Sequence, residues 1–383
     1  MKTNIPERIA ALREAMRQQK VDAYIIPSSD PHLSEYPADR WKSREWISGF
    51  TGSAGTIVVT ADKAGLWTDS RYFLQAASQL EGSGIELYKL ALPETPSITE
   101  FLLHELHAGQ AVGLDGQTYS AAEASALANK LSRKEIKLDP SADLIEGIWK
   151  DRPAVPGNPI FEMPEALSGA SVHEKLDLIN NQLRSEGADC LILAALDEIA
   201  WTFNIRGTDV TYNPVSYAFV SEDESVLFIK PEKLTAEITE HLKKEGVTLA
   251  EYSMIQRYLS RLPENSRVFV DMNKTNVSLY DAIPGNCTIV EGISPANHLK
   301  SIKNETEIKG FQNAVVKDGV ALTKFYIWLE KQMAEGAQVT EISAAEKLTA
   351  LRAEQPQYIM DSFGTICGYA EHGAIVHYSA TPE

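Results

Sequence analysis

The chain has 383 residues, of which 44% are hydrophobic and 23% are charged, and its formal net charge is −17. This length exceeds what one hydrophobic core accommodates, so two or three domains are expected in a globular protein. The excess of acidic residues argues against nucleic acid as a partner, because phosphate binding needs a basic surface.

The N-terminal sequence and the lack of long apolar runs predict a cytoplasmic protein that makes no membrane contact. Residues 1–20 are charged throughout and contain no apolar core of a signal peptide. No segment approaches the roughly 20 apolar residues of a membrane span. The three cysteines are far apart and lack C-x-x-C spacing, so neither a disulfide framework nor a structural zinc site is expected.

The chain opens with a helix followed by a strand. Helical periodicity predicts one apolar face, formed by Ile5, Ile9, Leu12 and Met16. A turn then leads into a short apolar run at 23–26, which predicts a buried strand that Pro27 closes.

The same pattern recurs about 167 residues later. Leu176, Ile179 and Leu183 form the apolar face of a second helix, and 190–193 is the matching strand. Both copies continue through a tryptophan-containing segment to a glycine and further strands. A period this long predicts two copies of an α/β domain and not a solenoid.

Segment 151–159 separates the two copies. It contains three prolines and one glycine, a composition that holds neither a helix nor a central strand. We therefore expect the first domain at 1–152 and the second at 153–300.

The pattern changes near residue 300. Asn304 and Glu307 have the spacing of a helix capping box, with Asn in place of Ser or Thr. Apolar residues follow at helical spacing as far as Gly336, the expected stop. A second helix is predicted to begin near Thr340 and to end before Pro356.

A β-hairpin is predicted after these helices. Its strands are expected around 362–367 and at 374–378, with His377 near the end of the second strand. Alternation along that strand would point His372 and His377 to opposite faces, which argues against a metal-binding pair. Two helices and one hairpin leave half a core exposed, so 301–383 is expected to be the first part of a larger domain.

Three further segments have weaker chemical signals. The glycines at 49–55 lack the spacing of a phosphate-binding loop, and a turn is the better interpretation. His104 and His107 fall one residue short of a zinc-binding helix motif and favour a solvated face. Arg71 follows a predicted strand, where it can either pair with Asp69 or bind an anionic or carbonyl group of a ligand.

Seven segments together resemble the cytosolic, three-domain Xaa-Pro aminopeptidases, the aminopeptidase P family. The segments are 22–28, 48–56, 67–76, 195–201, 204–207, 340–345 and 373–378. The resemblance implies an α/β (α+β) fold with two duplicated creatinase-like N-terminal domains. The first part of a pita-bread catalytic domain would follow at 301–383.

The resemblance also implies an activity. Family members are hydrolases that remove the N-terminal residue before a proline, using two divalent cations, usually manganese. A cytoplasmic homodimer acting on peptides with proline at the second position is expected. His377 matches a histidine that contacts substrate near the scissile bond, and Arg71 matches a substrate-binding arginine of the first domain.

The chain departs from the family pattern because it lacks the residues that bind the metal ions. The family's ligands are two aspartates, a histidine and two glutamates, all expected beyond Glu383. Residues 1–383 alone are therefore expected to bind no metal and to be inactive.

Other functions remain as alternatives. A peptidase-like protein-binding module without metals would suit a basic partner, given the charge of −17. A prolidase is the nearest other enzyme, and a metal-independent relative similar to creatine amidinohydrolase is a further candidate. The duplicated N-terminal domain, Arg71 and His377 favour the aminopeptidase.

Overall fold

The computed structural model of the protein describes residues 4–141 and 143–382. The chain divides into two compact units. The first unit runs to Met163 and includes Ala170–Ile302, and it holds both copies of the repeat. The second unit combines Pro164–Gly169 with the chain from Lys303 onward.

The first copy of the repeat is built on a six-stranded sheet with the order β4-β3-β2-β1-β5-β6. The central strand β1 pairs antiparallel with β2 and parallel with β5. The strands are β1 (Ala23–Pro27), β2 (Thr56–Thr60), β3 (Ala64–Thr68), β4 (Glu86–Lys89), β5 (Ala111–Leu114) and β6 (Lys137–Asp139).

The second copy repeats this topology strand for strand, with the order β12-β11-β10-β8-β13-β14. Here β8 pairs antiparallel with β10 and parallel with β13. The strands are β8 (Cys190–Leu193), β10 (Ser216–Ser221), β11 (Ser225–Ile229), β12 (Val247–Ala250), β13 (Arg267–Val270) and β14 (Thr288–Glu291). A separate short pair is formed by β7 (Phe161–Glu162) and β9 (Ile205–Arg206). The predicted duplication is confirmed.

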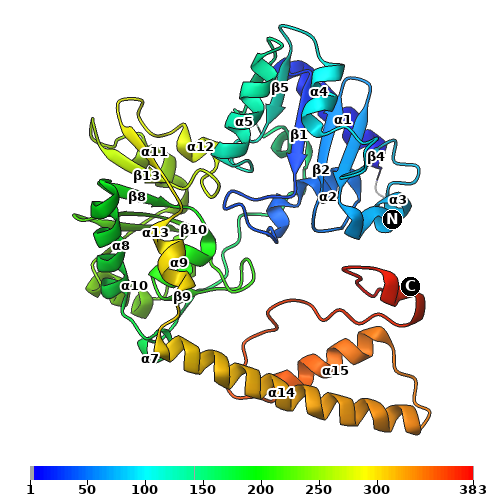
Figure 1. Cartoon of the computed structure of the whole chain (residues 1–383), viewed down its shortest axis with the longest axis vertical. Coiled ribbons are helices and arrows are strands. Elements are labelled where there is room, and N and C mark those ends of the chain that lie inside the picture. Colours follow the sequence, from blue (N-terminus) through cyan, green and yellow to red (C-terminus); the bar gives the residue numbers. More distant parts are fainter. Residues whose placement is uncertain (1–3, 142, 383) are drawn as a thin grey trace. The chain divides into compact units, whose positions relative to one another are not determined.

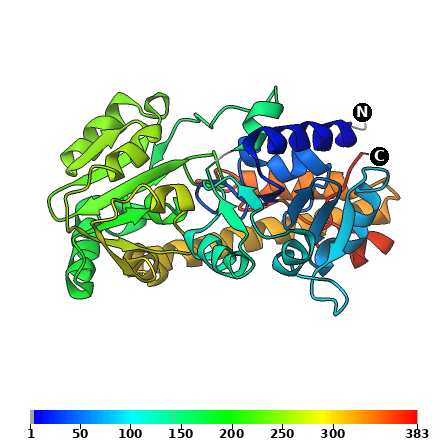
Figure 2. The same cartoon turned by 90° about the horizontal axis from the view of Figure 1, so that it is seen from above.

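Helices cover both faces of each sheet (Figures 1 and 2). In the first copy, Tyr24 and Ile26 pack on the side of α1, whereas Ala23 and Ile25 pack on the side of α4 and α5. This alternation follows from the two-residue period of a strand. The helices are α1 (Ile5–Gln19), α2 (Ser43–Ser48), α3 (Phe73–Gln79), α4 (Ile98–Glu105), α5 (Ala121–Ser132) and α6 (Leu144–Ile148).

The second copy has its own set of helices. The predicted apolar face of α8 is buried, as is that of α1 in the first copy. The helices are α8 (Val172–Glu186), α9 (Leu196–Thr202), α10 (Ala236–Lys244), α11 (Ile255–Leu259), α12 (Val277–Tyr280) and α13 (Pro295–Ser301).

The two copies are joined by a buried polar contact. His32, in the loop after β1, is only 2% exposed and bonds through Nδ1 to the carbonyl of Ala194 at the end of β8, at 2.9 Å. The preceding Pro31 carbonyl accepts from Asn276 Nδ2 at 2.7 Å and from the Tyr217 hydroxyl at 3.3 Å. These residues place a loop of the first copy at the edge of the second sheet where β8 ends and β10 begins.

The second unit consists mainly of helices α14 (Glu305–Ala334) and α15 (Glu341–Ala353), with the short α7 (Glu165–Ser168). The predicted capping box is present, because Asn304 accepts from the Glu307 amide while Glu307 accepts from the Asn304 amide. Helix α15 packs along α14, where Arg352 Nε donates to Asp318 Oδ1 at 2.7 Å.

The predicted β-hairpin is wrong. Within the described residues of 362–378 there is no strand, and Ala370–Ala374 forms a short 3₁₀ helix, η5. His377 has a positive φ of 58°, which no extended strand has. The apolar run at 374–376 therefore does not form a strand, because a strand needs a neighbouring strand to satisfy its backbone groups and the described part of the second unit contains none.

Apolar side chains of the second unit remain exposed to solvent. Of the 30 residues of α14, only Ala321 is buried. The exposed large side chains on this helix are Ile308, Phe311, Val315, Val316, Val320, Tyr326, Ile327 and Met333. Among the helices in the described part of the chain, none has the length and apolar character that a membrane span requires.

Candidate functional site

Arg71 lies in the first unit, directly after a buried strand. Strand β3 ends at Thr68, and Ser70–Tyr72 forms a short 3₁₀ helix, η2, before α3 begins. Thr68 is fully buried and its hydroxyl donates to the Ala54 carbonyl at 2.6 Å. Tyr72 is also buried and its hydroxyl lies 2.7 Å from Ser53 Oγ. The backbone on both sides of Arg71 is therefore firmly held.

The guanidinium of Arg71 is paired with Asp69. Arg71 Nε donates to Asp69 Oδ1 and Nη2 donates to Oδ2, each at 2.8 Å. The two side chains are 36% and 35% exposed. The hydrogen bonds that Arg71 donates to Asp69 raise the pKa of Arg71 above its usual value. Of the two roles that the sequence suggests for Arg71, pairing with Asp69 is present in the structure, and ligand binding remains a prediction.

The glycine-rich segment 49–55 is a loop that is stabilised by hydrogen bonds from the side chain of Arg44. Arg44 is buried, and its guanidinium donates to the carbonyls of Phe50 and Gly52. Burial lowers the pKa of Arg44 to about 10. A Cβ on Gly52 would lie 2.3 Å from the Phe50 ring and 2.7 Å from the Tyr72 ring, so only glycine fits. The segment joins α2 to β2 and has a structural role, in agreement with the turn that the sequence predicted.

His377 lies in the second unit, and its side chain is exposed. It belongs to the irregular C-terminal segment that follows η5, and not to a strand. The predicted opposition of His372 and His377 across a strand therefore does not apply.

A cluster around Glu341 holds this segment. Tyr378 donates to Glu341 Oε2 at 2.8 Å, and His372 Nδ1 lies 3.1 Å from both carboxylate oxygens. The backbone amide of Tyr369 donates to Oε1 at 2.5 Å. Partial burial opposes ionisation of Glu341, but these hydrogen bonds outweigh it and hold the pKa of Glu341 below its usual value. The rings of His372 and Tyr378 also stack, with centroids 4.6 Å apart.

The contacts by which Glu341 holds the C-terminal segment were not predicted from the sequence. Its position at the start of a helix suggests only a favourable interaction with the helix dipole. No local pattern predicts its contacts, because Tyr378 is 37 residues away in sequence.

His104 and His107 form no metal site. His104 is 83% exposed and pairs with Glu105, which also binds Lys63. Within residues 4–141 and 143–382, no three His, Cys, Asp or Glu side chains are grouped so as to hold a metal ion. The residues described here therefore do not fit the dinuclear metal centre that the family resemblance implies.

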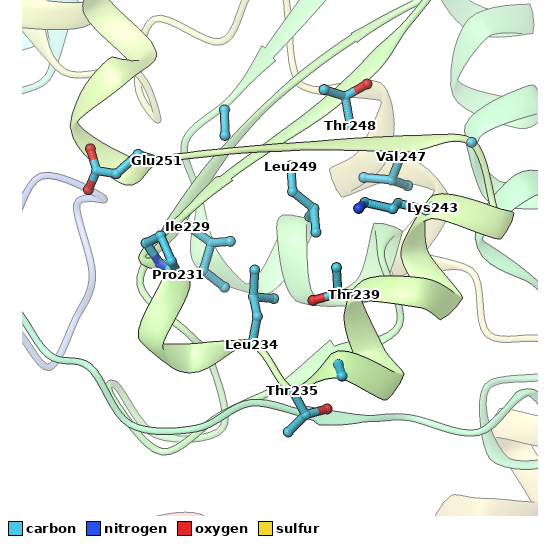
Figure 3. Close-up of a pocket in the computed structure, with 13 residues that line it drawn as sticks. Ile229, Pro231, Leu234, Thr235, Thr239, Lys243, Val247, Thr248, Leu249 and Glu251 are labelled. Atoms are coloured by element: carbon cyan, nitrogen blue, oxygen red, sulfur yellow. The ribbon is translucent and has the colours of Figure 1, made fainter.

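The second copy of the repeat contains a hollow. It has a volume of about 810 Å³ and lies between α10 and strands β11 and β12 (Figure 3). It is lined by aliphatic side chains, by three threonines, and by the charged residues Lys243 and Glu251. Neither Arg71 nor His377 contributes to this hollow, which carries no group of catalytic side chains.

Family models describe most of the first unit. A model of the creatinase/prolidase N-terminal domain matches residues 8–148, and a second model with the same description matches residues 151–307.

Similar proteins extend over nearly the whole chain. A probable Xaa-Pro aminopeptidase P of Coprinopsis cinerea is 38% identical over 395 residues, covering 98% of this chain and 63% of the relative. Aminopeptidase P2 of Arabidopsis thaliana is 37% identical and covers 100% and 59%, respectively.

A solved structure is also similar. The X-prolyl aminopeptidase of Caenorhabditis elegans, described as a cytosolic enzyme with a dinuclear active site, is 30% identical with a TM-score of 0.93. The match covers 99% of this chain and 64% of that one. The chain therefore spans about three-fifths of the length of these relatives.

Proposed function

We propose that this chain is the N-terminal part of an Xaa-Pro aminopeptidase, because two models of the creatinase/prolidase N-terminal domain match it and it is similar to such enzymes over nearly its whole length. The full-length protein would remove the N-terminal residue of peptides that have proline at the second position. The observation that carries this proposal is the structural match over 99% of the chain to an X-prolyl aminopeptidase.

The relatives also favour this proposal over its alternatives. The relatives that cover 98–100% of this chain are named aminopeptidases. A cytoplasmic location and a homodimer, both implied by the family resemblance, are part of the proposal.

The metal centre of the enzyme is proposed to lie in the part of the relatives that this chain does not cover. The described residues lack a group of three metal ligands. Two divalent cations, with manganese as the expected metal, would be bound there.

Two residues of this chain are proposed to act on substrate. A proline amide has no N–H on the leaving side, so the substrate offers mainly carbonyl acceptors around the scissile bond. Arg71 presents guanidinium donors that suit a carbonyl or carboxylate group of the peptide. His377 would donate a hydrogen bond to the substrate carbonyl and stabilise the charge that develops on its oxygen.

The role of His377 is tested in the full-length, metal-loaded protein. His377→Ala is expected to lower kcat on an Xaa-Pro peptide by about 10²–10⁴-fold, the usual contribution of an acid–base or charge-stabilising group. The melting temperature should change little, because the side chain is exposed. His104→Ala, which removes another exposed histidine, is the control and should retain full activity.

The same measurements decide the proposal. Wild-type enzyme should cleave Xaa-Pro peptides and leave matched Xaa-Ala peptides intact. Absence of Xaa-Pro cleavage would overturn the proposed activity, and an unchanged kcat in the His377 variant would overturn the role of that residue alone.

A further inference from the structure

Arg71 donates three hydrogen bonds to the carboxylate of Asp69, two from its side chain and one from its backbone amide. Asp69 Oδ1 accepts from the Arg71 backbone amide at 3.1 Å and from Nε at 2.8 Å, while Oδ2 accepts from Nη2 at 2.8 Å. The same residue therefore caps η2 and binds one edge of the guanidinium.

Such a pair contributes little to the stability of the fold. Both side chains are about one-third exposed, and ion pairs that water reaches typically contribute little to stability. Its geometric effect is larger, because an unconstrained arginine side chain has many rotamers and loses their entropy when it is ordered.

The backbone around the pair is rigid enough to transmit this constraint. Thr68 immediately before Asp69 is buried and bonded to Ala54, and Tyr72 immediately after Arg71 is buried and bonded to Ser53. The guanidinium carbon of Arg71 lies 5.1 Å from the centre of the Tyr72 ring, which restricts it further.

We propose that Asp69 is a positioning residue that fixes the direction in which Arg71 presents its guanidinium to a peptide carbonyl or carboxylate. The planar guanidinium has a second donor edge, formed by Nη1 and Nη2. Binding the Nε–Nη2 edge to Asp69 sets the orientation of that second edge. The inference rests on the proposed function, in which Arg71 binds substrate.

The first experiment measures the side chain itself and needs no activity. In the 383-residue chain, the Arg71 Nε–H proton is expected to exchange slowly with water because Asp69 accepts it. Asp69→Ser keeps a hydroxyl that can cap the Arg71 amide but cannot bind both Nε and Nη2. NMR of arginine side chains should show at least tenfold faster exchange of the Arg71 Nε–H in this variant.

Glu14→Gln provides a matched control. Glu14 accepts from Nε and Nη2 of Arg17 in an exposed pair on α1. This variant should change the Arg17 signal and leave that of Arg71 unaltered. If Asp69→Ser leaves Arg71 Nε–H exchange unchanged, the positioning role is overturned.

The second experiment measures catalysis by the full-length, metal-loaded protein. Asp69→Ser should raise KM for Xaa-Pro peptides of three or more residues by about tenfold, with kcat unchanged, and Arg71→Ala should do the same. In the double variant the two effects should not add, because Asp69 acts only through Arg71.

The outcomes separate the inference from the proposed function. If Asp69→Ser raises KM as much in the Arg71→Ala background as in the wild type, Asp69 does not act through Arg71 and the inference fails. If the wild-type enzyme cleaves no Xaa-Pro peptide, the proposed function fails, and the NMR comparison still decides whether Asp69 orients Arg71.

Discussion

His32 links the two copies of the repeat through both nitrogens of its ring. Nδ1 lies 2.9 Å from the Ala194 carbonyl, and Nε2 lies 2.9 Å from the Tyr252 hydroxyl. A carbonyl can only accept, so Nδ1 carries the proton and the neutral ring accepts from Tyr252 through Nε2. Protonation of Nε2 would turn this acceptor into a donor inside a buried interface.

The charged form of His32 is accordingly disfavoured in the folded protein. Burial lowers the pKa of His32 to about 4, although Asp30 and the Ala194 carbonyl partly oppose the shift. In the unfolded chain the imidazole titrates near pH 6.5. Between about pH 6.5 and 4 the unfolded chain therefore binds a proton that the folded chain does not, and stability decreases as the pH falls.

We expect this effect to remove up to about 3 kcal/mol of stability between pH 7.5 and pH 4, since each pKa unit corresponds to about 1.4 kcal/mol. Urea unfolding at the two pH values measures the loss. His32→Gln, which has no titrating group, should lose less stability over the same range, whereas the exposed-site control His104→Gln should behave as the wild type. An equal loss in wild type and His32→Gln would contradict the assignment.

Among the elements, helix α14 begins with an asparagine whose side chain uses both its acceptor and its donor. Asn304 Oδ1 accepts from the Glu307 amide at 2.9 Å, and Asn304 Nδ2 donates to the Ser168 carbonyl at 2.8 Å. Serine or threonine at this position would cap the helix equally well, but their shorter side chains lack the separate amide donor. The choice of asparagine is thus explained by its contact with α7.

Two substitutions separate these roles. Asn304→Ala should destabilise the start of α14 by about 1 kcal/mol through the lost cap alone. Asn304→Asp keeps the cap acceptor but places a carboxylate against the Ser168 carbonyl, so it should loosen α7 and spare the helix. Hydrogen exchange at the Glu307 amide reports the cap, and exchange in 165–169 reports α7. Ser97→Ala, in the capping box of α4, should change neither region.

For the whole molecule, the decisive property is the metal content of residues 1–383. Tight binding of two hard cations needs several converging oxygen ligands. The part of the chain that the structure describes offers no group of three candidate ligands. We therefore predict that this chain alone binds no stoichiometric manganese or zinc and does not cleave Xaa-Pro peptides.

Elemental analysis of the purified, dialysed 383-residue chain measures this directly. The full-length protein, prepared in the same way, serves as the positive comparison and should carry two metal ions together with peptidase activity. Two metal ions per 383-residue chain, with activity, would show that the catalytic centre lies within this chain after all.

Local features of the fold were predictable from the sequence. The apolar faces of α1 and α8, the strands β1 and β8, and the capping box at Asn304 all depend on residues within a few positions of each other. Periodicity and capping chemistry report such contacts directly. The duplication was predictable for the same reason, since each copy repeats the local pattern.

The tertiary structure alone decided which distant residues meet. The hairpin predicted for 362–378 failed because alternation shows that a segment is compatible with a strand, and not that a partner strand exists. Glu341 holds that segment instead, and His32 reaches Ala194 across 162 residues of sequence. The sequence is compatible with an Arg71–Asp69 pair, but only the tertiary structure shows that its hydrogen bonds form. Local pattern determined the elements of this protein, whereas long-range hydrogen bonds, which leave no periodic signal, determined how its site residues are held.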